Sequence, residues 1–269
     1  MSLKVGILGA SGRMGQAVIV AAKRLDVAVT AAVVSQQSPR YGQPIRANDA
    51  DGGVCFQHAD ELQAGQVEVL IDFSLPQALS ANLALAQRLQ VPIVVCTTGL
   101  GESHQQALDQ AATSIPVLYA ANTSVGITLL RQLVKLTAAA WPHTDIEIIE
   151  AHHSAKRDGP SGTALALGAS AAAGRGVELA DVSAGVRGDG LRQPGSIGFA
   201  VVRAADIIGE HTVLFAQSGE RLELTHRVGD RHIFAQGAVQ AAQWLQQQPA
   251  GRYSMADMLQ LRTLLQDLL

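Results

Sequence analysis

The amino-acid sequence predicts a two-domain α/β protein: a parallel sheet, followed by an α+β domain with a mixed or largely antiparallel sheet. Apolar strand-like runs alternate with helical runs over the first part of the chain, and strand-like runs then follow one another with few helices between them. The length of 269 residues also favours two domains over one compact core.

The first part of the chain reads as a series of parallel βαβ units. Strands are expected at 4–8, 27–34, 67–73, 92–96 and 116–120, and helices at 14–23, 76–89 and 103–113. Short runs rich in Val, Ile and Leu are typical of parallel strands buried on both faces. Ligands of such open sheets bind beyond the carboxyl ends of the strands.

The pattern changes after Asn122. A helix is expected at 127–140, a strand at 146–149 and a helix at 164–173, and strand-like runs at 198–203, 211–215 and 221–225 follow with few helices between them. This succession favours a mixed or antiparallel sheet. The run 233–247 is helical again and is compatible with a return to the first domain.

Composition excludes several classes of protein. Hydrophobic residues make up 48% of the chain and charged residues 16%, so sizeable cores can form. The net charge of −3 and the lack of a Lys/Arg block argue against a nucleic-acid or anionic-membrane surface. No apolar run approaches the ~18 residues of a membrane span, and the first residues lack the features of a signal peptide. A soluble cytoplasmic protein is expected.

A glycine-rich segment at 9–15 (GASGRMG) directly follows the first strand and opens a helix. Glycines there permit a tight turn and the close approach of the backbone to a pyrophosphate, which then faces the helix N-terminus. The spacing GxxGxxG is weak evidence by itself, but the strand before it and the helix after it are the context that dinucleotide binding requires. The segment predicts a Rossmann-type domain, with a ligand-free glycine turn as the alternative.

The end of the second strand bears on the choice of dinucleotide. An acid usually stands there to bind the ribose hydroxyls of NAD, but residues 33–37 read VVSQQ. Arg40 lies nearby and could meet a 2′-phosphate. NADH, NADPH or both are therefore expected as cofactors.

The densest chemistry lies in segment 150–164 (EAHHSAKRDGPSGTA), between a strand and a helix. Ser161 is a plausible N-cap, which leaves the backbone N–H groups of Gly162 and Thr163 at a helix N-terminus. Together with Lys156, these donors form a credible anion site. A solvated loop over 156–158 is the alternative.

The adjacent histidines, His152 and His153, point to opposite faces of an extended chain, so one can face a ligand while the other packs elsewhere. They could be metal ligands, but no third ligand has recognisable spacing, and no metal is expected. Cys55 and Cys96 cannot form a disulfide framework or a zinc site by themselves. Cys96 could be a catalytic nucleophile, although a small buried residue near the cofactor is the preferred reading. His226 is given no role.

Segment 150–164 closely resembles the signature of the dihydrodipicolinate reductases, E-x-H-H-x-x-K-x-D-x-P-S-G-T-A. Other segments resemble landmarks of that family in the family's order, and the resemblance covers essentially the whole chain. They are the glycine loop, 72–74 (DFS), 97–99 (TTG), 121–126 (ANTSVG) and 219–226 (GERLELTH).

The resemblance implies a Rossmann domain of residues 1–123 and 233–269 and a substrate-binding and oligomerisation domain of residues 124–232. It implies reduction of a cyclic dicarboxylate, 4-hydroxy-tetrahydrodipicolinate, to tetrahydrodipicolinate by NADH or NADPH, on the way to diaminopimelate and lysine. It also implies a homotetramer that assembles through the sheet of the second domain.

The resemblance assigns roles by motif position. His152 would donate or accept the proton with Lys156 as its catalytic partner, and the substrate would contact His153, Ser161, Gly162 and Thr163. The cofactor would contact Gly9, Ala10, Ser11, Gly12, Arg13, Met14, Ser35, Cys96, Thr97, Thr98, Ala120, Ala121, Asn122 and Thr123.

The chain departs from the family pattern at three places. Many members carry Glu-Arg where Val34-Ser35 stands, Gly where Cys96 stands and Phe where Thr123 stands. These departures leave the cofactor preference and the nicotinamide surroundings open.

Two rival functions remain. One is another two-domain dehydrogenase of amino-acid metabolism, acting on a semialdehyde or keto acid. The other is a nucleotide-sensing binding protein without catalysis. Segment 150–164 favours an enzyme, because a sensor needs no proton donor beside an anion pocket.

Overall fold

The computed structural model describes residues 2–45, 53–261 and 263. The chain divides into two compact units, one made of Met1–Ser124 with His232–Leu269 and the other of Val125–Arg231. The parts of the predicted first domain that fall on residues 1, 46–52, 262 and 264–269 lie outside the described residues.

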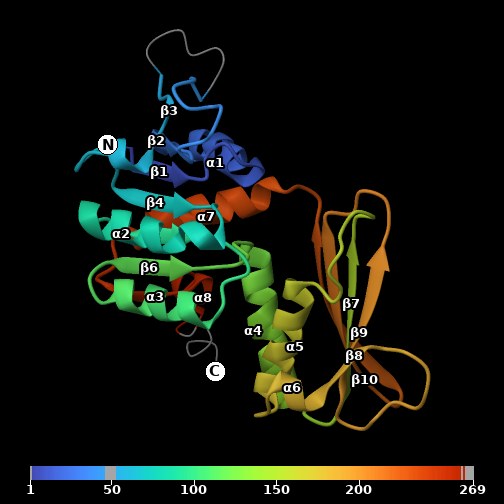
Figure 1. Cartoon of the computed structure of the whole chain (residues 1–269). Coiled ribbons are helices and arrows are strands. Elements are labelled where there is room, and N and C mark those ends of the chain that lie inside the picture. The colour runs from blue at the N-terminus through green and yellow to red at the C-terminus, as the bar shows by residue number, and fades with distance from the viewer. Residues whose placement is uncertain (1, 46–52, 262, 264–269) are drawn as a thin grey trace. The chain divides into compact units, whose positions relative to one another are not determined.

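Over its described residues, the first unit contains a sheet of seven parallel strands in the order β12-β6-β5-β4-β1-β2-β3 (Figure 1). Its central strands are buried on both faces, as their Val/Ile/Leu runs predict. The strands are β1 (Lys4–Leu8), β2 (Ala28–Val33), β3 (Phe56–Gln57), β4 (Val69–Asp72), β5 (Ile93–Val95), β6 (Pro116–Tyr119) and β12 (Gly251–Tyr253).

Helices cover both faces of this sheet. Strand side chains alternate between the faces, so Ile71 of β4 packs in the cluster with α1 (Arg13–Arg24) and α7 (His232–Leu245). Its neighbour Leu70 packs in the cluster with α2 (Leu79–Leu89) and α3 (Glu102–Ala112). The shorter helices of the unit are η1 (Ala59–Glu61), η2 (Pro76–Ala78) and α8 (Met255–Met258).

The strand order places a switch point between β1 and β4. β1 pairs with β2 on one side and with β4 on the other, so the sheet grows outward in both directions from this pair. A crevice for a ligand is expected at the carboxyl ends of such strands. The glycine loop follows β1 there, and Phe73 and Ser74 follow β4.

The second unit has a mixed sheet in the order β11-β10-β7-β9-β8 (Figure 1). β10 is antiparallel to β7 and β11, whereas β9 is parallel to β7 and β8. The elements are α4 (Val125–Ala140), β7 (Asp145–His152), α5 (Gly162–Gly174), α6 (Leu179–Val182), β8 (Ser183–Val186), β9 (Ile197–Arg203), β10 (Gly209–Gln217) and β11 (Glu220–Val228). The predicted fold class is confirmed.

One face of this sheet packs on α4 and α5, where Ile146, Ile148, Leu167 and Phe199 are buried together. Burial alternates along β7, and the alternation continues past the apolar run to the strand's end. β7 is therefore longer than the predicted strand at 146–149. Its C-terminal end carries two polar side chains, Glu150 and His152, on the buried face. Within the part of the chain that the structure describes, no helix has the length and apolar character needed to cross a bilayer.

Candidate active site

The glycine loop of the first unit is packed too tightly for side chains. Gly9 has a φ of +74°, and a Cβ there would lie 2.7 Å from the carbonyl oxygen of Phe73. A Cβ on Gly15 would lie 2.7 Å from the Cα of Ala10 and closer still to the carbonyl oxygen of Gly9. These two glycines therefore let α1 and the end of β4 pack directly against the loop.

Gly12 is the N-cap of α1 and provides no side-chain cap for the first turn. An uncapped helix start can bind an anion through its N–H groups and its positive dipole end. Arg13 and Met14 then form the first helical residues. This arrangement fits the pyrophosphate of a dinucleotide.

A pocket of about 430 Å³ lies at this helix start. Its wall includes the loops after β1, β4, β5 and β6 and one residue of α7. Most of the predicted cofactor residues meet here, although Gly9, Ala10, Ser11 and Ser35 are not part of the wall. The lining residues are Gly12, Arg13, Met14, Phe73, Ser74, Cys96, Thr97, Thr98, Ala120, Ala121, Asn122, Thr123 and Phe234.

Sequence reasoning gave no site role to Phe73, Ser74 or Phe234, which also line this pocket. Phe73 and Ser74 could have been found, because they follow a strand that adjoins the switch point. Phe234 had no such signal, because it comes from the far end of the chain. Thr123, in place of the family's common Phe, donates a hydrogen bond from Oγ1 to the carbonyl oxygen of Phe234 at 2.6 Å.

Asp72 connects two of the pocket loops, those after β4 and β5, by hydrogen bonds. Its buried carboxylate accepts a hydrogen bond from the N–H of Ser74 at 2.8 Å and one from Oγ1 of Thr97 at 3.4 Å. Its carbonyl oxygen accepts from the N–H of Cys96 at 2.8 Å. Burial raises the pKa of Asp72, although its hydrogen bonds, chiefly those from Ser74, oppose the rise.

Cys96 is not placed to act as a nucleophile. Burial, and then the negative charge of Asp72, raise the pKa of its thiol well above the ordinary value. Reactive cysteines have the opposite property, a lowered pKa that supplies the thiolate. The geometry agrees with the reading of Cys96 as a small buried residue in the pocket wall.

At the end of β2, Ser35 is exposed, whereas Val34 is buried. The guanidinium of Arg40 lies over the ring of Phe56, 5.8 Å from its centroid, so this cation is held at the surface beside the strand end. No acidic side chain occupies 33–37.

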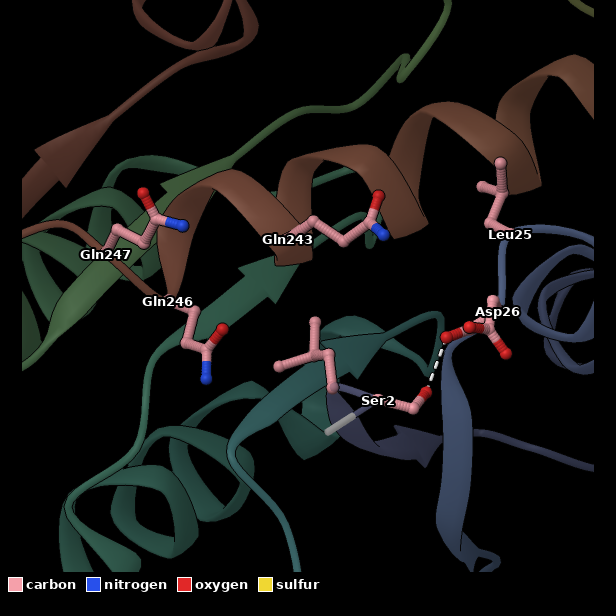
Figure 2. A pocket seen from close by; sticks show the side chains of 7 residues that line it. Ser2, Leu25, Asp26, Gln243, Gln246 and Gln247 are labelled. Atoms are coloured by element: carbon pink, nitrogen blue, oxygen red, sulfur yellow. Dashed lines mark hydrogen bonds between the residues drawn. The ribbon is translucent and has the colours of Figure 1, made fainter.

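A second hollow of the first unit is lined by residues outside the glycine loop and outside the predicted cofactor site. Figure 2 shows the Gln243, Gln246 and Gln247 side chains of the α7 region on one side and the Ser2 and Asp26 region on the other. The hydroxyl of Ser2 donates a hydrogen bond to the carbonyl oxygen of Asp26 at 2.5 Å. The hollow shares no lining residue with the pocket at the glycine loop.

In the second unit, a buried carboxylate is the centre of a polar network. Glu150 has no exposed surface, and its Oε1 lies 2.9 Å from Nη2 of Arg203 and accepts from the N–H of Ser161 at 3.1 Å. Its Oε2 lies 2.8 Å from Nδ1 of His152. Burial pushes the pKa of Glu150 up, but hydrogen bonds from Arg203 and Ser161 and the charges of His152 and Arg203 bring it below the ordinary value.

His152 is 8% exposed, at the end of β7. Burial lowers its pKa, Glu150 acts to raise it, and the charges of Lys156 and Arg203 lower it further. A buried imidazole whose protonation depends on one carboxylate and two cations is typical of a functional group rather than of a packing residue. His153, the next residue, is half-buried.

His211, to which sequence reasoning gave no role, joins the same network from β10. Its Nε2 lies 3.1 Å from Oγ of Ser161 and 3.9 Å from Oε2 of Glu150, and its ring lies 5.1 Å from that of His152 at 75°. Burial, followed by the charge of His152, lowers the pKa of His211 to about 4. His211 is therefore neutral at neutral pH.

The start of α5 lies next to this network. Ser161 is the N-cap, and its Oγ accepts from the N–H of Ala164 at 3.2 Å, as the sequence predicts. The helix begins at Gly162, where an added Cβ would meet no atom within 4 Å. The helix therefore begins with an exposed residue at Gly162, and helix starts of this kind can bind an anion.

Lys156 is 22% exposed and lies 2.8 Å from Oδ1 of Asp158. The hydrogen bond from Lys156 is the main reason that the pKa of Asp158 is lowered. Lys156 also acts on the two histidines, because its charge contributes to the lowered pKa values of both His152 and His211.

Donor atoms of Glu150, His152 and His211 lie within 4.8 Å of one another, which is close enough for a metal ion to bridge them. The other oxygen of Glu150 already contacts the guanidinium of Arg203. A cation supplied by the protein therefore compensates part of the charge of this carboxylate.

Fold and sites together define a class of protein. The first unit has the fold and the glycine loop of an NAD(P)-binding domain, and the second carries a buried carboxylate–imidazole pair beside the start of α5. This combination is typical of a two-domain nicotinamide-dependent oxidoreductase. The chain belongs to the dihydrodipicolinate reductase family: the model of the family's N-terminus matches residues 3–123, and that of its C-terminus matches residues 126–259. The family predicted from the motifs is confirmed.

Curated relatives agree over the whole chain. The 4-hydroxy-tetrahydrodipicolinate reductase of Pseudoalteromonas atlantica is 45% identical over 264 residues, which cover 96% of this chain and 99% of the relative. That of Zymomonas mobilis is 44% identical, with 97% and 98% covered. A dipicolinate-bound dihydrodipicolinate reductase from Paenisporosarcina sp. TG-14 has the same fold, with a TM-score of 0.76 at 22% identity over 96% of this chain and 99% of that one.

Proposed function

We propose that this chain reduces 4-hydroxy-tetrahydrodipicolinate to tetrahydrodipicolinate with NADH or NADPH, in the biosynthesis of diaminopimelate and lysine. The observation that carries the proposal is the buried Glu150–His152 pair beside the start of α5. This pair lies within a motif of a family whose members match the chain over nearly its whole length.

The cofactor is proposed to bind at the glycine loop and the 430 Å³ pocket. The bound nicotinamide supplies the hydride. Gly9, Ala10, Ser11 and Gly12 are proposed to contact the pyrophosphate together with the first turn of α1. The nicotinamide end would be surrounded by the rest of the pocket wall. These residues are Met14, Phe73, Cys96, Thr97, Thr98, Ala120, Ala121, Asn122, Thr123 and Phe234.

For the adenosine end, we propose that NADPH is accepted at least as well as NADH. Nothing acidic at Val34 or Ser35 repels a 2′-phosphate. Arg40, held over the ring of Phe56, is the nearest candidate in the sequence for a cationic partner.

The substrate is a dianion, and the protein has a net charge of −3, so binding must depend on local donors. Moving an ion from water into a buried site without compensating partners costs several kcal/mol of binding free energy. We propose that the N–H groups of Gly162 and Thr163 bind one carboxylate at the start of α5, with Ser161 as the cap and Lys156 supplying charge. His153 is proposed as a further substrate contact.

His152 is proposed as the group that delivers the proton while the hydride is transferred. A positioned general acid typically contributes ~10²–10⁴-fold. Lys156 assists by its charge, which lowers the pKa of His152 and makes the imidazolium a stronger acid.

We propose a homotetramer that assembles through the face of the second sheet opposite α4 and α5. Ile149 and Val202 are 40% and 44% exposed on the described surface of that sheet. Light scattering of the purified protein tests this: a monomer at micromolar concentration would contradict it.

The reaction is tested by following NAD(P)H oxidation by absorbance while the substrate is generated from pyruvate and aspartate semialdehyde by a condensing enzyme. We expect oxidation only with both precursors present. Oxidation of cofactor with aspartate semialdehyde alone would instead favour the rival semialdehyde dehydrogenase. Absence of oxidation under all conditions, with dinucleotide still bound, would favour the sensor.

The carboxylate site is tested with 2,6-pyridinedicarboxylate, an aromatic mimic of the cyclic dicarboxylate. Thr163→Val removes a hydroxyl at similar volume and is expected chiefly to raise KM, whereas Lys156→Ala is expected to lower kcat as well. Both variants should weaken binding of the mimic to the cofactor-loaded enzyme. Undiminished binding in both would place the carboxylate site elsewhere.

A further inference from the structure

We infer that Glu150 is a positioning residue that holds His152 with its proton on Nδ1, so that Nε2 is the nitrogen that exchanges a proton with the substrate. The inference rests on the proposed function, in which His152 delivers the proton. It assigns the chemistry to one atom of the ring and assigns a positioning role to a carboxylate that has no exposed surface.

The contact is fixed by the strand itself. Glu150 and His152 are two residues apart on β7, so both side chains project from its buried face. Oε2 of Glu150 lies 2.8 Å from Nδ1 of His152. A carboxylate accepts and cannot donate, so its charge at this distance favours the tautomer of His152 with the proton on Nδ1.

Nε2 of His152 lies beside a glycine. A Cβ at residue 209 would lie 3.2 Å from Nε2 and 3.4 Å from Cδ2, but that residue is Gly209, the first of β10. A side chain at residue 209 would therefore crowd the Nε2 edge of the ring.

Glu150 also connects the proton donor to the substrate-binding helix start. Its Oε1 accepts from the N–H of Ser161, the N-cap of α5, and lies 2.9 Å from Nη2 of Arg203. One buried carboxylate thus restrains both the imidazole and the first turn that is proposed to bind a substrate carboxylate. Removal of its charge should disturb proton transfer and alignment together.

The charged groups around His152 define the expected effect on its protonation. Glu150 on β7 favours the imidazolium, whereas Lys156 in the loop after β7 and Arg203 on β9 oppose it. His211 on β10 faces it as a neutral ring, since its pKa is about 4. Neutralising Glu150 therefore leaves only opposing charges, and the pKa of His152 should fall.

The test uses Glu150→Gln, which keeps the shape and removes the charge. We expect kcat to fall by up to about 10⁴-fold, the loss known for a serine protease when the carboxylate that fixes the tautomer of the catalytic histidine is changed to an amide. NAD(P)H affinity should remain at the wild-type value, and the pH at which kcat declines should move to lower pH, because protonated His152 then persists over a narrower range. A matched control is Glu178→Gln, which removes the charge of an exposed glutamate outside the sheet, just before α6, and should change none of these quantities.

A second measurement keeps the inference testable if Glu150→Gln does not fold. Nitrogen-15 NMR of the neutral histidines in the wild-type protein reports which ring nitrogen carries the proton, and we expect Nδ1–H for His152. Finding Nε2–H would overturn the inference, as would a folded Glu150→Gln enzyme with wild-type kcat and pH profile. Zinc bound stoichiometrically by the wild-type protein and lost in Glu150→Gln would also overturn it, by giving the cluster to a metal. The NMR readout needs no substrate, so it stands even if the proposed reaction is not observed.

Discussion

The glycine loop offers a pair of substitutions that separate packing from cofactor binding. Gly12→Ala and Gly15→Ala each add one methyl group, and the two residues lie one helical turn apart in the same motif. Their surroundings differ, because the Cβ at position 12 would meet only the carbonyl oxygen of Gly9, at 3.2 Å. The Cβ at position 15 would lie 2.7 Å from the Cα of Ala10 and closer still to the carbonyl oxygen of Gly9.

These distances determine the expected losses of stability. Overpacking costs about 1–3 kcal/mol, and the upper end applies to Gly15→Ala because its neighbours are backbone atoms that cannot rotate away. Alanine improves helix propensity by up to ~1 kcal/mol, so a net loss of about 2 kcal/mol is expected. For Gly12→Ala, with an ordinary φ of −70°, the loss is the weaker capping of Ala, about 1 kcal/mol or less.

Cofactor affinity should follow a different order. A methyl group at position 12 projects at the pocket wall where the phosphates are proposed to approach the backbone, so Gly12→Ala should weaken NADPH binding at least tenfold, which is about 1.4 kcal/mol. Urea unfolding gives the free energy of unfolding, and titration of NADPH fluorescence gives the affinity. A Gly12→Ala protein that is as stable as expected and binds NADPH like the wild type would refute the placement of the pyrophosphate.

Three further predictions concern single side chains. His152→Ala should lower kcat by ~10²–10⁴-fold while NAD(P)H binding stays near normal, and an unchanged kcat in steady-state assays would remove His152 from the mechanism. Val34→Glu should shift the ratio of kcat/KM values toward NADH, because it adds a ribose acceptor and a charge that opposes a 2′-phosphate; a wild-type enzyme that ignores NADPH would contradict this reading of the strand end. Burial raises the folded-state pKa of Asp72 above its ordinary value of 3.8, so protonation of Asp72 favours the folded state. The stability that Asp72 contributes is fully present below pH 3.8 and is lost as the pH rises through the folded-state pKa. Relative to Asp72→Asn, the wild type should therefore gain stability as the pH falls from neutrality, which unfolding curves at several pH values can check.

The first unit could be predicted closely because its signals are local. β1 and the helix after it follow from an apolar run, three glycines and an amphipathic stretch. The strands that sequence reasoning did not predict, β3, β8 and β12, are short and form only because a neighbouring strand is there to pair with. The predicted helix 76–89 begins as the 3₁₀ turn η2, with Pro76 as its first residue. The rest of the pocket needed the strand order, which brings residues from distant parts of the chain to one edge.

The acid–base site shows why a motif predicts some of its members and not others. Glu150 and His152 belong to the motif, and the strand period of two is enough to place them on one face. His211 and Arg203 join them only through strand pairing, because His211 lies opposite Glu150 on β10 and Arg203 beside His152 on β9. A slip of one residue in the β7–β10 register would turn His211 to the opposite face of the sheet, together with the apolar side chains of β10. The alternation of β10 therefore places His211 on the buried face, but it does not say which residue of β7 lies opposite it. The proton donor is therefore local to the motif, whereas the electrostatic balance that sets its protonation is a property of the whole sheet.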